Sequence, residues 1–492
     1  MLFNSIEFVV FLPIVFVLYW FCCNRNLRLQ NLLVVAASYV FYGWWDWRFL
    51  VLIAITSMCS WISGILMYKI DNIRPVNGDQ FAINKMVGRK RRFVAAANIV
   101  LNISILATFK YYDFFIIEFA KLFHLSADGL LLNLMLPVGI SFYTFQALSY
   151  SIDVYHRKIE PTHDVIAFFA YISFFPQLVA GPIERATNLL PQFLKKREFD
   201  YVIAVEGAWQ ILWGFFKKIV IADNCALIVN QIFESYGSQN ASVLLLGAIL
   251  FSFQIYGDFS GYSDIAIGVS KLFGIKLMRN FYAPYFSRDI AEFWRRWHIS
   301  LNTWFRDYVY IPLGGSRTTK IKVIRNVFVI FLLSGFWHGA NWTFIAWGAY
   351  HAILFLPLIM FNRNRKYINE AAEKKHLPSP VEILQMFATF FMVTIGWVIF
   401  RSETIGDAIA YIRGIFDKSI LEFPTLPNPD IIYNGYGIML LLIVLVLVVD
   451  WINYKRIRVF KYRWVKVAFA YILLFIIAYY GGQPQKFIYF QF

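Results

Sequence analysis

Two histidines stand in strongly apolar surroundings and are the residues most able to do chemistry. His298 lies in FWRRWHISL and His338 in SGFWHGANW. Burial disfavours the imidazolium form and leaves a ring nitrogen that can accept a proton. An ionisable side chain at membrane depth is a candidate functional residue. The alternative for His338 is a structural histidine satisfied by a backbone carbonyl at a helix break.

The neighbours of the two histidines support different interpretations. Gly335 and Gly339 interrupt the apolar run around His338 and would let a substrate come close to the imidazole. His298 is predicted to share a helix face with Arg295 and Asn302 at helical spacing. That helix, in SRDIAEFWRRWHISLNTWFRDYVY, is predicted to be amphipathic and interfacial, and the alternative is that its arginines only reach lipid phosphates. His351, among aromatics, is predicted to be structural.

Further polar residues interrupt apolar segments. Asp258 and Asp264, in FSFQIYGDFSGYSDIAIG, need partners and are predicted to find arginine or histidine. They are expected to support the structure more than to catalyse. Lys217 and Lys218 are predicted to extend from the membrane toward water, and the alternative is that they mark the cytoplasmic mouth of a cavity.

The composition is that of an integral membrane protein. Of the 492 residues 59% are hydrophobic, 20% aromatic and 15% charged, whereas soluble domains carry about 25% charged residues. A span needs about 20 apolar residues. The sequence therefore predicts an all-α membrane protein with about 11 to 13 transmembrane helices. The predicted helices lie near 5–22, 31–45, 48–67, 93–117, 133–151, 206–233, 242–270, 323–337, 340–361, 381–400, 435–452 and 465–481.

The net charge of +16 is distributed as in a membrane protein and not as in a nucleic-acid-binding protein. Short loops on one side of the predicted membrane hold 37 of the 46 Lys and Arg residues. Basic loops face the cytoplasm. Both termini are therefore predicted to be extracytoplasmic, and no nucleic-acid partner is expected.

One apolar stretch, 165–182, is broken by Pro176 and Pro182 and predicts a re-entrant element that other protein segments cover. No linker or repeat divides the chain, so residues 1–492 are predicted to form a single membrane domain. Its core is expected at 130–361, with a cytoplasmic amphipathic segment at 271–326.

Several catalytic signatures are missing. The chain has no G-x-S-x-G, no phosphate-binding G-x-x-x-x-G-K-[ST] and no HExxH motif, which disfavours serine hydrolases, NTPases and zinc proteases. The four cysteines show no metal-ligand spacing, and no metal site or permanently bound cofactor is predicted.

The chain resembles the membrane-bound O-acyltransferase (MBOAT) superfamily, most of all the membrane subunits of bacterial alginate O-acetyltransferases. The resemblance runs from about residue 30 to 355, and the pair FWRRWHISL and GFWHGANW carries most of it. It implies an MBOAT fold with a central funnel, an essential intramembrane histidine at His338, and a second family position at His298. Orienting or oxyanion roles are expected for Asn302, Asn341 and Trp337.

The same resemblance implies a reaction. An acetyl group would pass from cytoplasmic acetyl-CoA to an extracytoplasmic polysaccharide, through a periplasmic hydrolase-like partner. His338 would act as general base on the acceptor hydroxyl or carry the acetyl group itself. The groups expected to hold the nucleotide end of CoA are Lys276, Arg279, Arg288, Arg295 and Arg296.

Three alternatives stay open at this point. Relatives that transfer D-alanyl groups to wall polymers share much of the pattern, so the acyl group is not fixed. A transporter for a polysaccharide or lipid-linked precursor would also have broken helices and buried polar groups, although no repeat is visible. A scaffold for an envelope complex explains the spans but not the buried histidines.

Overall fold

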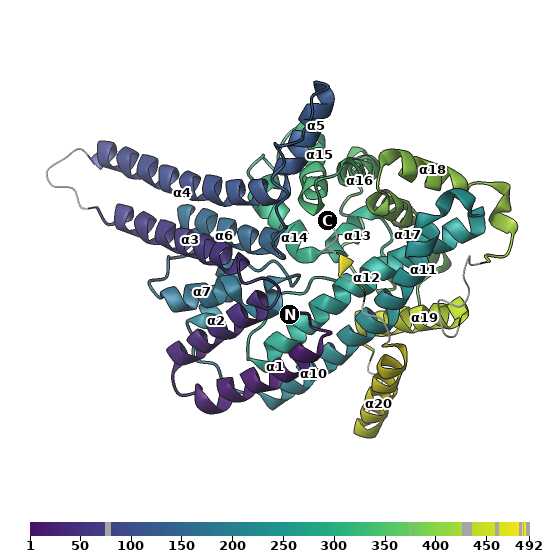
Figure 1. The fold of residues 1–492 in the computed structure, drawn as a ribbon, viewed down its shortest axis with the longest axis horizontal. Coiled ribbons are helices and arrows are strands. Elements are labelled where there is room, and N and C mark those ends of the chain that lie inside the picture. Colours follow the sequence, from purple (N-terminus) through teal and green to yellow (C-terminus); the bar gives the residue numbers. More distant parts are fainter. Residues whose placement is uncertain are drawn as a thin grey trace. The chain divides into compact units, whose positions relative to one another are not determined.

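The computed structural model describes residues 1–73, 80–373, 375–425, 435–457, 462–481, 485 and 487–488. These residues form helices and connecting turns (Figure 1). No residue of the described ranges is assigned to a β-strand. The prediction of an all-α protein is confirmed.

Among the described residues, seven helical segments are long and apolar enough to cross a membrane. They are α3 (Phe49–Asp71), Asn84–Lys110 of α4 (Gln80–Lys110), α12 (Ala241–Leu272), α15 (Lys320–His338), α16 (Trp342–Met360), α17 (Pro380–Arg401) and Gly437–Tyr454 of α19 (Gly435–Tyr454). Shorter apolar helices lie at Ile6–Cys22, which comprises α1 (Ile6–Val17) and η1 (Leu18–Cys22), and at Trp464–Tyr480 of α20 (Arg463–Tyr480). The protein is therefore a multi-pass membrane protein, as predicted.

The chain groups into two compact units. The first contains residues 1–211 and 266–278, and the second contains 212–265 and 279–492. The single-domain organisation and the 130–361 core stay predictions.

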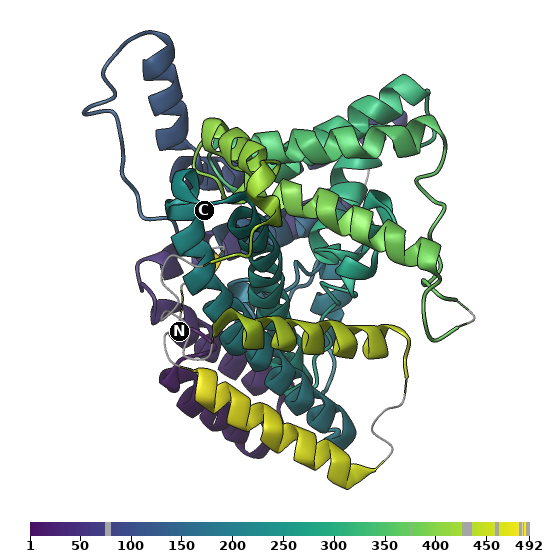
Figure 2. The ribbon, with the colours of Figure 1, turned by 90° about the vertical axis from the view of Figure 1, so that its right-hand side faces the viewer.

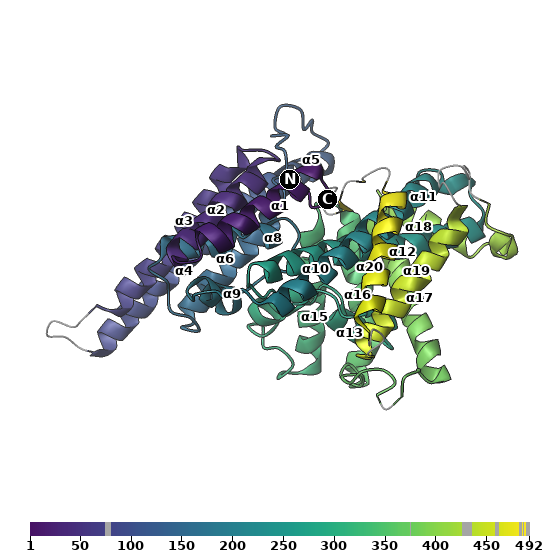
Figure 3. The same ribbon diagram turned by 90° about the horizontal axis from the view of Figure 1, so that it is seen from below.

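The first unit is built from the N-terminal helices. Besides α1, α3 and α4 it contains α2 (Leu27–Gly43), α5 (Tyr112–Leu122), α6 (Ile140–Tyr155), α7 (Val165–Ser173), α8 (Phe175–Leu178), α9 (Ala186–Phe193) and most of α10 (Tyr201–Phe215). Helices α3 and α4 lie side by side (Figure 3). Buried Asn98 of α4 donates hydrogen bonds to Ser151 Oγ of α6 (2.6 Å) and Ser60 Oγ of α3 (3.3 Å). Apolar helices are thus joined by polar contacts inside the unit.

Two predicted helix boundaries in this unit are wrong. The predicted 93–117 helix breaks at Tyr111, between α4 and α5. The predicted 133–151 helix begins only at Ile140, because Gly139 adopts φ 75°. A Cβ at Gly139 would lie 2.3 Å from the Leu178 carbonyl oxygen, so the turn requires glycine.

The proline-containing stretch at 165–182 forms α7 and α8, separated at Phe174. Asp164 caps α7, accepting hydrogen bonds from the N–H groups of Ile166 and Ala167 (both 3.0 Å). Residues from Ala167 to Leu178 are nearly all buried. Protein therefore covers this broken segment, as expected for irregular backbone in a membrane protein.

The second unit is built around α12. It also contains η2 (Phe216–Ala222), α11 (Asp223–Glu234), η3 (Tyr236–Ser238), η4 (Pro284–Phe286), α13 (Ile290–Arg296), α14 (Ile299–Phe305), η5 (Arg306–Tyr310), α15 to α17, α18 (Ile405–Ile415), η6 (Lys418–Leu421), α19 and α20. Helices α15 and α16 pack as a hairpin (Figure 2). Their close approach requires Gly335, where a Cβ would lie 2.2 Å from the Phe344 carbonyl oxygen.

The intramembrane lysines and aspartates pair with each other. Lys217 Nζ lies 2.5 Å from Asp264 Oδ2, and Lys218 Nζ lies 2.8 Å from Asp258 Oδ1 and 2.7 Å from Asp223 Oδ1. Both lysines are buried. The predictions of arginine or histidine partners, and of lysines extending to water, are wrong, because the π-helical η2 points both lysines toward α12 and α11.

The amphipathic segment is not one helix. It forms α13, α14 and the π-helical η5, with a break at Trp297 and His298. His298 adopts φ 44° and ψ 53°. The predicted shared helix face of Arg295, His298 and Asn302 is therefore wrong, because helical spacing does not continue through a left-handed residue.

Candidate active site

His298 lies in a turn that an extended segment holds in place. The Ile299 N–H donates to the Asn280 carbonyl (2.9 Å), and the Tyr282 N–H donates to the Arg296 carbonyl (3.0 Å). These bonds lie on either side of His298 and secure its left-handed conformation. Such conformations in residues other than glycine are uncommon and concentrate at functional sites.

The His298 side chain is fully enclosed, with 1% of the residue exposed. Its Nδ1 lies 3.1 Å from Asn280 Oδ1. Its Nε2 has no hydrogen-bond partner among the described residues. Burial lowers the pKa of His298 to about 3, so the ring is neutral at physiological pH.

His338 ends α15 and lies in an aromatic cage. It is 5% exposed. Ring centroids of Trp337, Trp347 and Phe400 lie 4.9, 5.2 and 5.4 Å from its own. The His298 and His338 rings are 6.5 Å apart between centroids. The structure thus brings together the two predicted histidines, which are 40 residues apart in the sequence.

The three predicted supporting residues have different surroundings. The ring centroid of Trp337 lies 5.9 Å from that of His298, so Trp337 contacts both histidines. Asn302 Nδ2 donates to the carbonyls of Trp294 (2.7 Å) and Trp297 (2.5 Å), which holds α14 against α13. Asn341 caps α16 by accepting from the Thr343 N–H (3.0 Å) and donates to the Glu403 carbonyl (3.0 Å). Both ends of the Asn341 amide and the Nδ2 group of Asn302 are therefore bonded to backbone groups.

A third histidine lies in the same aromatic region. His351 is fully buried, and its ring centroid lies 5.1 Å from that of Trp347 and 4.9 Å from that of Trp294. Neither of its nitrogens has a hydrogen-bond partner in the described part of the chain. The structural role predicted for His351 stays a prediction.

A cavity of about 600 Å³ lies within the second unit, and neither His298 nor His338 is among the residues that line it. It is lined by Ala291, Trp294, Arg295, Ile299, Asn302, Thr303, Phe305, Arg306, Tyr310, Ser316, Val327, Ile330, Phe331, Ser334, Phe355, Asn364, Arg365 and Ile368. Three of these residues are arginines and most of the others are apolar. Ser334 precedes His338 by one turn of α15, and Ile299 follows His298 directly. The cavity therefore reaches the immediate neighbours of both histidines.

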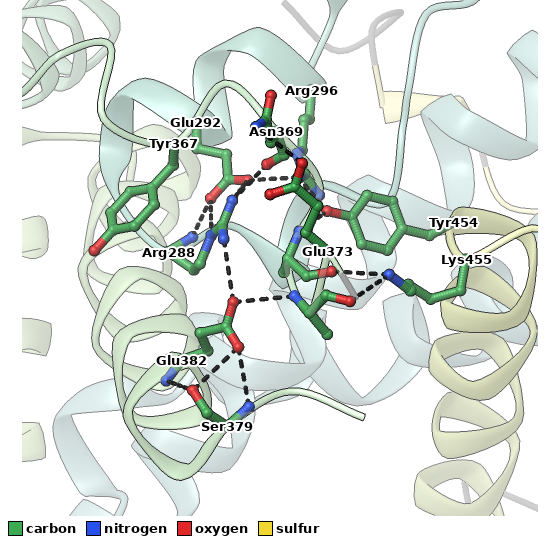
Figure 4. Close-up of polar contacts among 12 residues, drawn as sticks. Arg288, Glu292, Arg296, Tyr367, Asn369, Glu373, Ser379, Glu382, Tyr454 and Lys455 are labelled. Atoms are coloured by element: carbon green, nitrogen blue, oxygen red, sulfur yellow. Dashed lines mark hydrogen bonds and ion pairs between the residues drawn. The ribbon is translucent and has the colours of Figure 1, made fainter. Parts of the chain in front are cut away.

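Most arginines of the amphipathic segment are bonded to other parts of the protein. Arg288 pairs with Glu292 (3.0 Å) and Glu382 (3.1 Å), while Arg296 Nη2 contacts Glu292 (2.5 Å) and the Tyr454 hydroxyl (2.6 Å) (Figure 4). We call these five residues the arginine cluster. Arg288 also donates to the Asn369 carbonyl (2.6 Å), so the cluster fastens the 361–379 loop to α13.

The predicted CoA-binding residues have different surroundings. Arg295 lines the cavity, although its guanidinium donates to the carbonyls of Asn364 (3.0 Å) and Tyr367 (2.7 Å). Arg279 lies over the Tyr282 ring at 4.8 Å. Lys276 belongs to the first unit, where its backbone bonds the side chain of Gln192. Contact of these residues with CoA stays a prediction.

Sequence reasoning missed several residues of the site. Asn280 lies 18 positions before His298 in an irregular segment, where no periodicity could signal the contact. Arg306 and Arg365 line the cavity from distant parts of the sequence. These two arginines do not stand out in the sequence, because the loops predicted to be cytoplasmic are rich in basic residues throughout.

Fold and site together define a multi-pass α-helical membrane protein with a buried histidine pair beside a cavity that contains arginines. Residues 140–399 match the model of the membrane-bound O-acyltransferase family. A probable alginate O-acetylase from Pseudomonas aeruginosa is 36% identical over 447 residues, covering 90% of this chain and 80% of the relative. A peptidoglycan O-acetyltransferase from Helicobacter pylori is 33% identical over 444 residues, covering 84% and 80%. A teichoic acid D-alanyltransferase from Bacillus subtilis is 33% identical over 287 residues, covering 55% and 70%.

The chain belongs to the membrane-bound O-acyltransferase family and is an acyltransferase. The resemblance found in the sequence is confirmed. Because this is a family of enzymes, its match favours an enzyme over the two alternatives, a transporter and a scaffold.

Proposed function

We propose that the protein transfers an acetyl group from cytoplasmic acetyl-CoA toward an extracytoplasmic polysaccharide. The observation that carries the proposal is a cavity with arginines in its lining that approaches His338 within one helical turn. The names of the relatives support the acyl group, because two of the three described above are O-acetylating enzymes.

The cavity fits the donor in chemical character. Arg306 and Arg365 supply cations suited to the phosphates of CoA. Arg306 is paired with Asp307 (2.7 Å), so a phosphate would share its guanidinium with that carboxylate. Trp294 and Phe331 supply an apolar wall for the pantetheine arm. A volume of about 600 Å³ lies within the usual range for small-molecule sites.

His338 is the group we assign to the chemistry. Acting as general base, it takes the proton of the acceptor hydroxyl while the oxygen bonds to the acyl carbon, the C–S bond breaks and the proton passes to the departing thiolate. Acting as nucleophile, it first takes the acyl group on nitrogen and then passes it to the hydroxyl. Both routes convert a thioester and an alcohol into an ester and a thiol. His298 serves the same site as an orienting group.

The identity and the location of the acyl acceptor are inferred from the relatives and from the predicted topology. Two relatives are named for alginate and peptidoglycan, which favours a cell-surface glycan, reached through a periplasmic hydrolase-like partner. The basic loops orient the chain in the bacterial inner membrane with both termini outside. D-alanyl transfer to a wall polymer is the second candidate, favoured by the similarity to the teichoic acid D-alanyltransferase.

The test measures acetylation of surface glycans in cells that express each variant, where the periplasmic partner is present. In proteoliposomes that contain the full chain, acetyl-CoA-dependent release of CoA thiol follows the transfer step itself, with an alginate oligosaccharide supplying the acceptor hydroxyl in place of the partner. We expect His338→Ala and His298→Ala to stay folded and to lose most of the activity. The matched control is His351→Phe, which replaces a buried histidine outside the pair and should keep it. Full turnover by His338→Ala would end the assignment.

A further inference from the structure

The hydrogen bonds around Asn280 determine which nitrogen of His298 carries a proton. The Ser300 backbone N–H approaches a side-chain atom of Asn280 at 3.3 Å, and Ser300 Oγ lies 2.8 Å from the same atom. A backbone N–H can only donate, so this Asn280 atom is the amide oxygen. The other end of the amide, Nδ2, donates to Ser263 Oγ (3.2 Å), which agrees with that orientation.

The same oxygen faces His298. His298 Nδ1 lies 3.1 Å from Asn280 Oδ1. Ser300 Oγ also lies 3.5 Å from Nδ1, but it gives its one hydrogen to Asn280 Oδ1 at 2.8 Å and is then left to accept. Because the Asn280 oxygen can only accept, Nδ1 carries the N–H, since two lone pairs at this distance would repel each other. In the neutral ring the remaining nitrogen, Nε2, is then unprotonated. Nε2 is also the ring nitrogen without a hydrogen-bond partner among the described residues.

We propose that Asn280 is a positioning residue that locks His298 in the Nδ1–H tautomer and so presents the Nε2 lone pair to the site. His298 then works as a hydrogen-bond acceptor that orients the acceptor hydroxyl. It does not polarise the thioester carbonyl, because a neutral imidazole with Nε2 unprotonated offers no donor there. This inference rests on the proposed function, to which it adds the role of His298.

Among the described neighbours of His298, Asn280 is the residue that determines which ring nitrogen carries the proton. Phe259 of α12 packs edge-on against the ring at a centroid distance of 4.6 Å, and Trp337 of α15 lies at 5.9 Å. Ser263 of α12 and Ser300 of α14 add hydroxyls, which do not titrate near neutral pH. Among the described neighbours, His338 is the titratable group whose ring faces His298. Arg279, adjacent to Asn280 in the sequence, lies over the Tyr282 ring.

The direct test is ¹⁵N NMR of the full chain in lipid with labelled histidine, since protonated and unprotonated ring nitrogens have well-separated shifts. The His298 signals are those that His298→Gln removes. We expect them to show a protonated Nδ1 and an unprotonated Nε2. Asn280→Asp keeps the oxygen and adds a negative charge, so it should keep the tautomer and raise the protonation midpoint of His298 by at least about 1 pH unit. Asn280→Leu should give a mixture of tautomers.

The matched control is Asn326→Asp, which adds the same charge at another fully buried asparagine of the second unit. Asn326 donates to the carbonyls of Leu313 and Gly315, and its replacement should leave the His298 midpoint unchanged. A protonated Nε2 in the unaltered protein, or an unmoved midpoint in Asn280→Asp, would overturn the inference even if Asn280→Leu fails to fold.

The spectra do not depend on catalysis, so the two proposals can fail separately. In the thiol-release assay Asn280→Leu should lower kcat by about 10-fold or more without raising KM, and Asn280→Asp should restore part of the loss near neutral pH. The expected tautomer together with full turnover by His298→Ala would contradict the proposed function. Equal turnover in Asn280→Leu and the unaltered protein would contradict the positioning role.

Discussion

The histidine pair and the arginine cluster lie in the same unit. The pair is buried, and the cluster is buried at Glu292, Arg296 and Tyr454 but partly exposed at Arg288 and Glu382. Their polar groups are used differently. In the arginine cluster, the single carboxylate of Glu292 accepts hydrogen bonds from both Arg288 and Arg296. At the histidine pair, the Nε2 atom of His298 has no partner among the described residues, and its surroundings are aromatic rings. The charged groups of the cluster are paired with one another, whereas Nε2 of His298 keeps its hydrogen-bonding capacity.

The hydrogen-bond partners of a buried group help to separate structural from catalytic residues within one segment. Residues 288–302 contribute to both regions, so their position in the sequence does not distinguish them. A buried charge whose partners are all protein groups costs stability when it is removed. A buried group with unused hydrogen-bonding capacity destabilises the fold slightly and can be kept for function. Unused capacity is not sufficient by itself, because both nitrogens of His351 also lack partners among the described residues; His298 differs in that its ring faces His338.

The largest expected effect tests the catalytic half of this comparison. His338→Gln should lower the rate of acetyl transfer about 10²- to 10⁴-fold, because a general base or nucleophile is lost. The free energy of unfolding should change by less than about 1.5 kcal/mol, since the side-chain volume is nearly kept. Thiol-release kinetics and thermal unfolding in detergent measure the two quantities. A large loss of stability with normal activity would reverse the assignment of the region.

The next effect tests the structural half. Glu292→Ala leaves Arg288 and Arg296 without their shared carboxylate and should lower the free energy of unfolding by about 3–5 kcal/mol. Thermal unfolding in detergent checks this value. The control is Glu118→Ala, which removes an exposed pair with Lys121 and should cost at most about 1 kcal/mol. Similar costs for the two variants would break the comparison.

A third effect follows from the pKa of His298. Burial lowers this pKa to about 3, below the unfolded value of about 6.5. Below about pH 6.5 the unfolded chain binds a proton at this histidine that the folded chain does not bind. The free energy of unfolding therefore falls on acidification, by up to about 1.4 kcal/mol per pH unit down to about pH 3. Unfolding measured at pH 7.5, 6 and 5 should show a weaker pH dependence in His298→Gln. His376→Gln, at an exposed histidine, should keep the original dependence, and the same slope in all three proteins would count against a buried neutral His298.

The smallest effect concerns the cavity. Arg306→Ala and Arg365→Ala should each raise KM for acetyl-CoA about 5- to 10-fold with little change in kcat, because each removes one cation from the donor end. Arg413→Ala, on the opposite predicted side of the membrane, serves as the control and should leave KM unchanged. If kcat falls while KM stays constant, the cavity holds something other than the donor.

Some of the site could be predicted from the sequence. His298 and His338 stand out because ionisable residues are rare in apolar segments, and the structure brings their rings together. The helices are evident from apolar runs of sufficient length. Their interruptions were predicted less well, since the break at His298 depends on hydrogen bonds from residues 280–282, which are distant in the sequence.

An all-α membrane enzyme of the O-acyltransferase family with two buried histidines could be predicted from the sequence. The length of the apolar segments, the charge of the loops and the local motifs are all properties of the chain itself. Only the tertiary structure decided which polar groups meet. It paired Lys217 and Lys218 with aspartates, bonded Arg288 and Arg296 to Glu292, and placed Asn280 against His298. These contacts join segments through turns, π-helical bulges and left-handed residues, whose geometry no regular sequence period encodes.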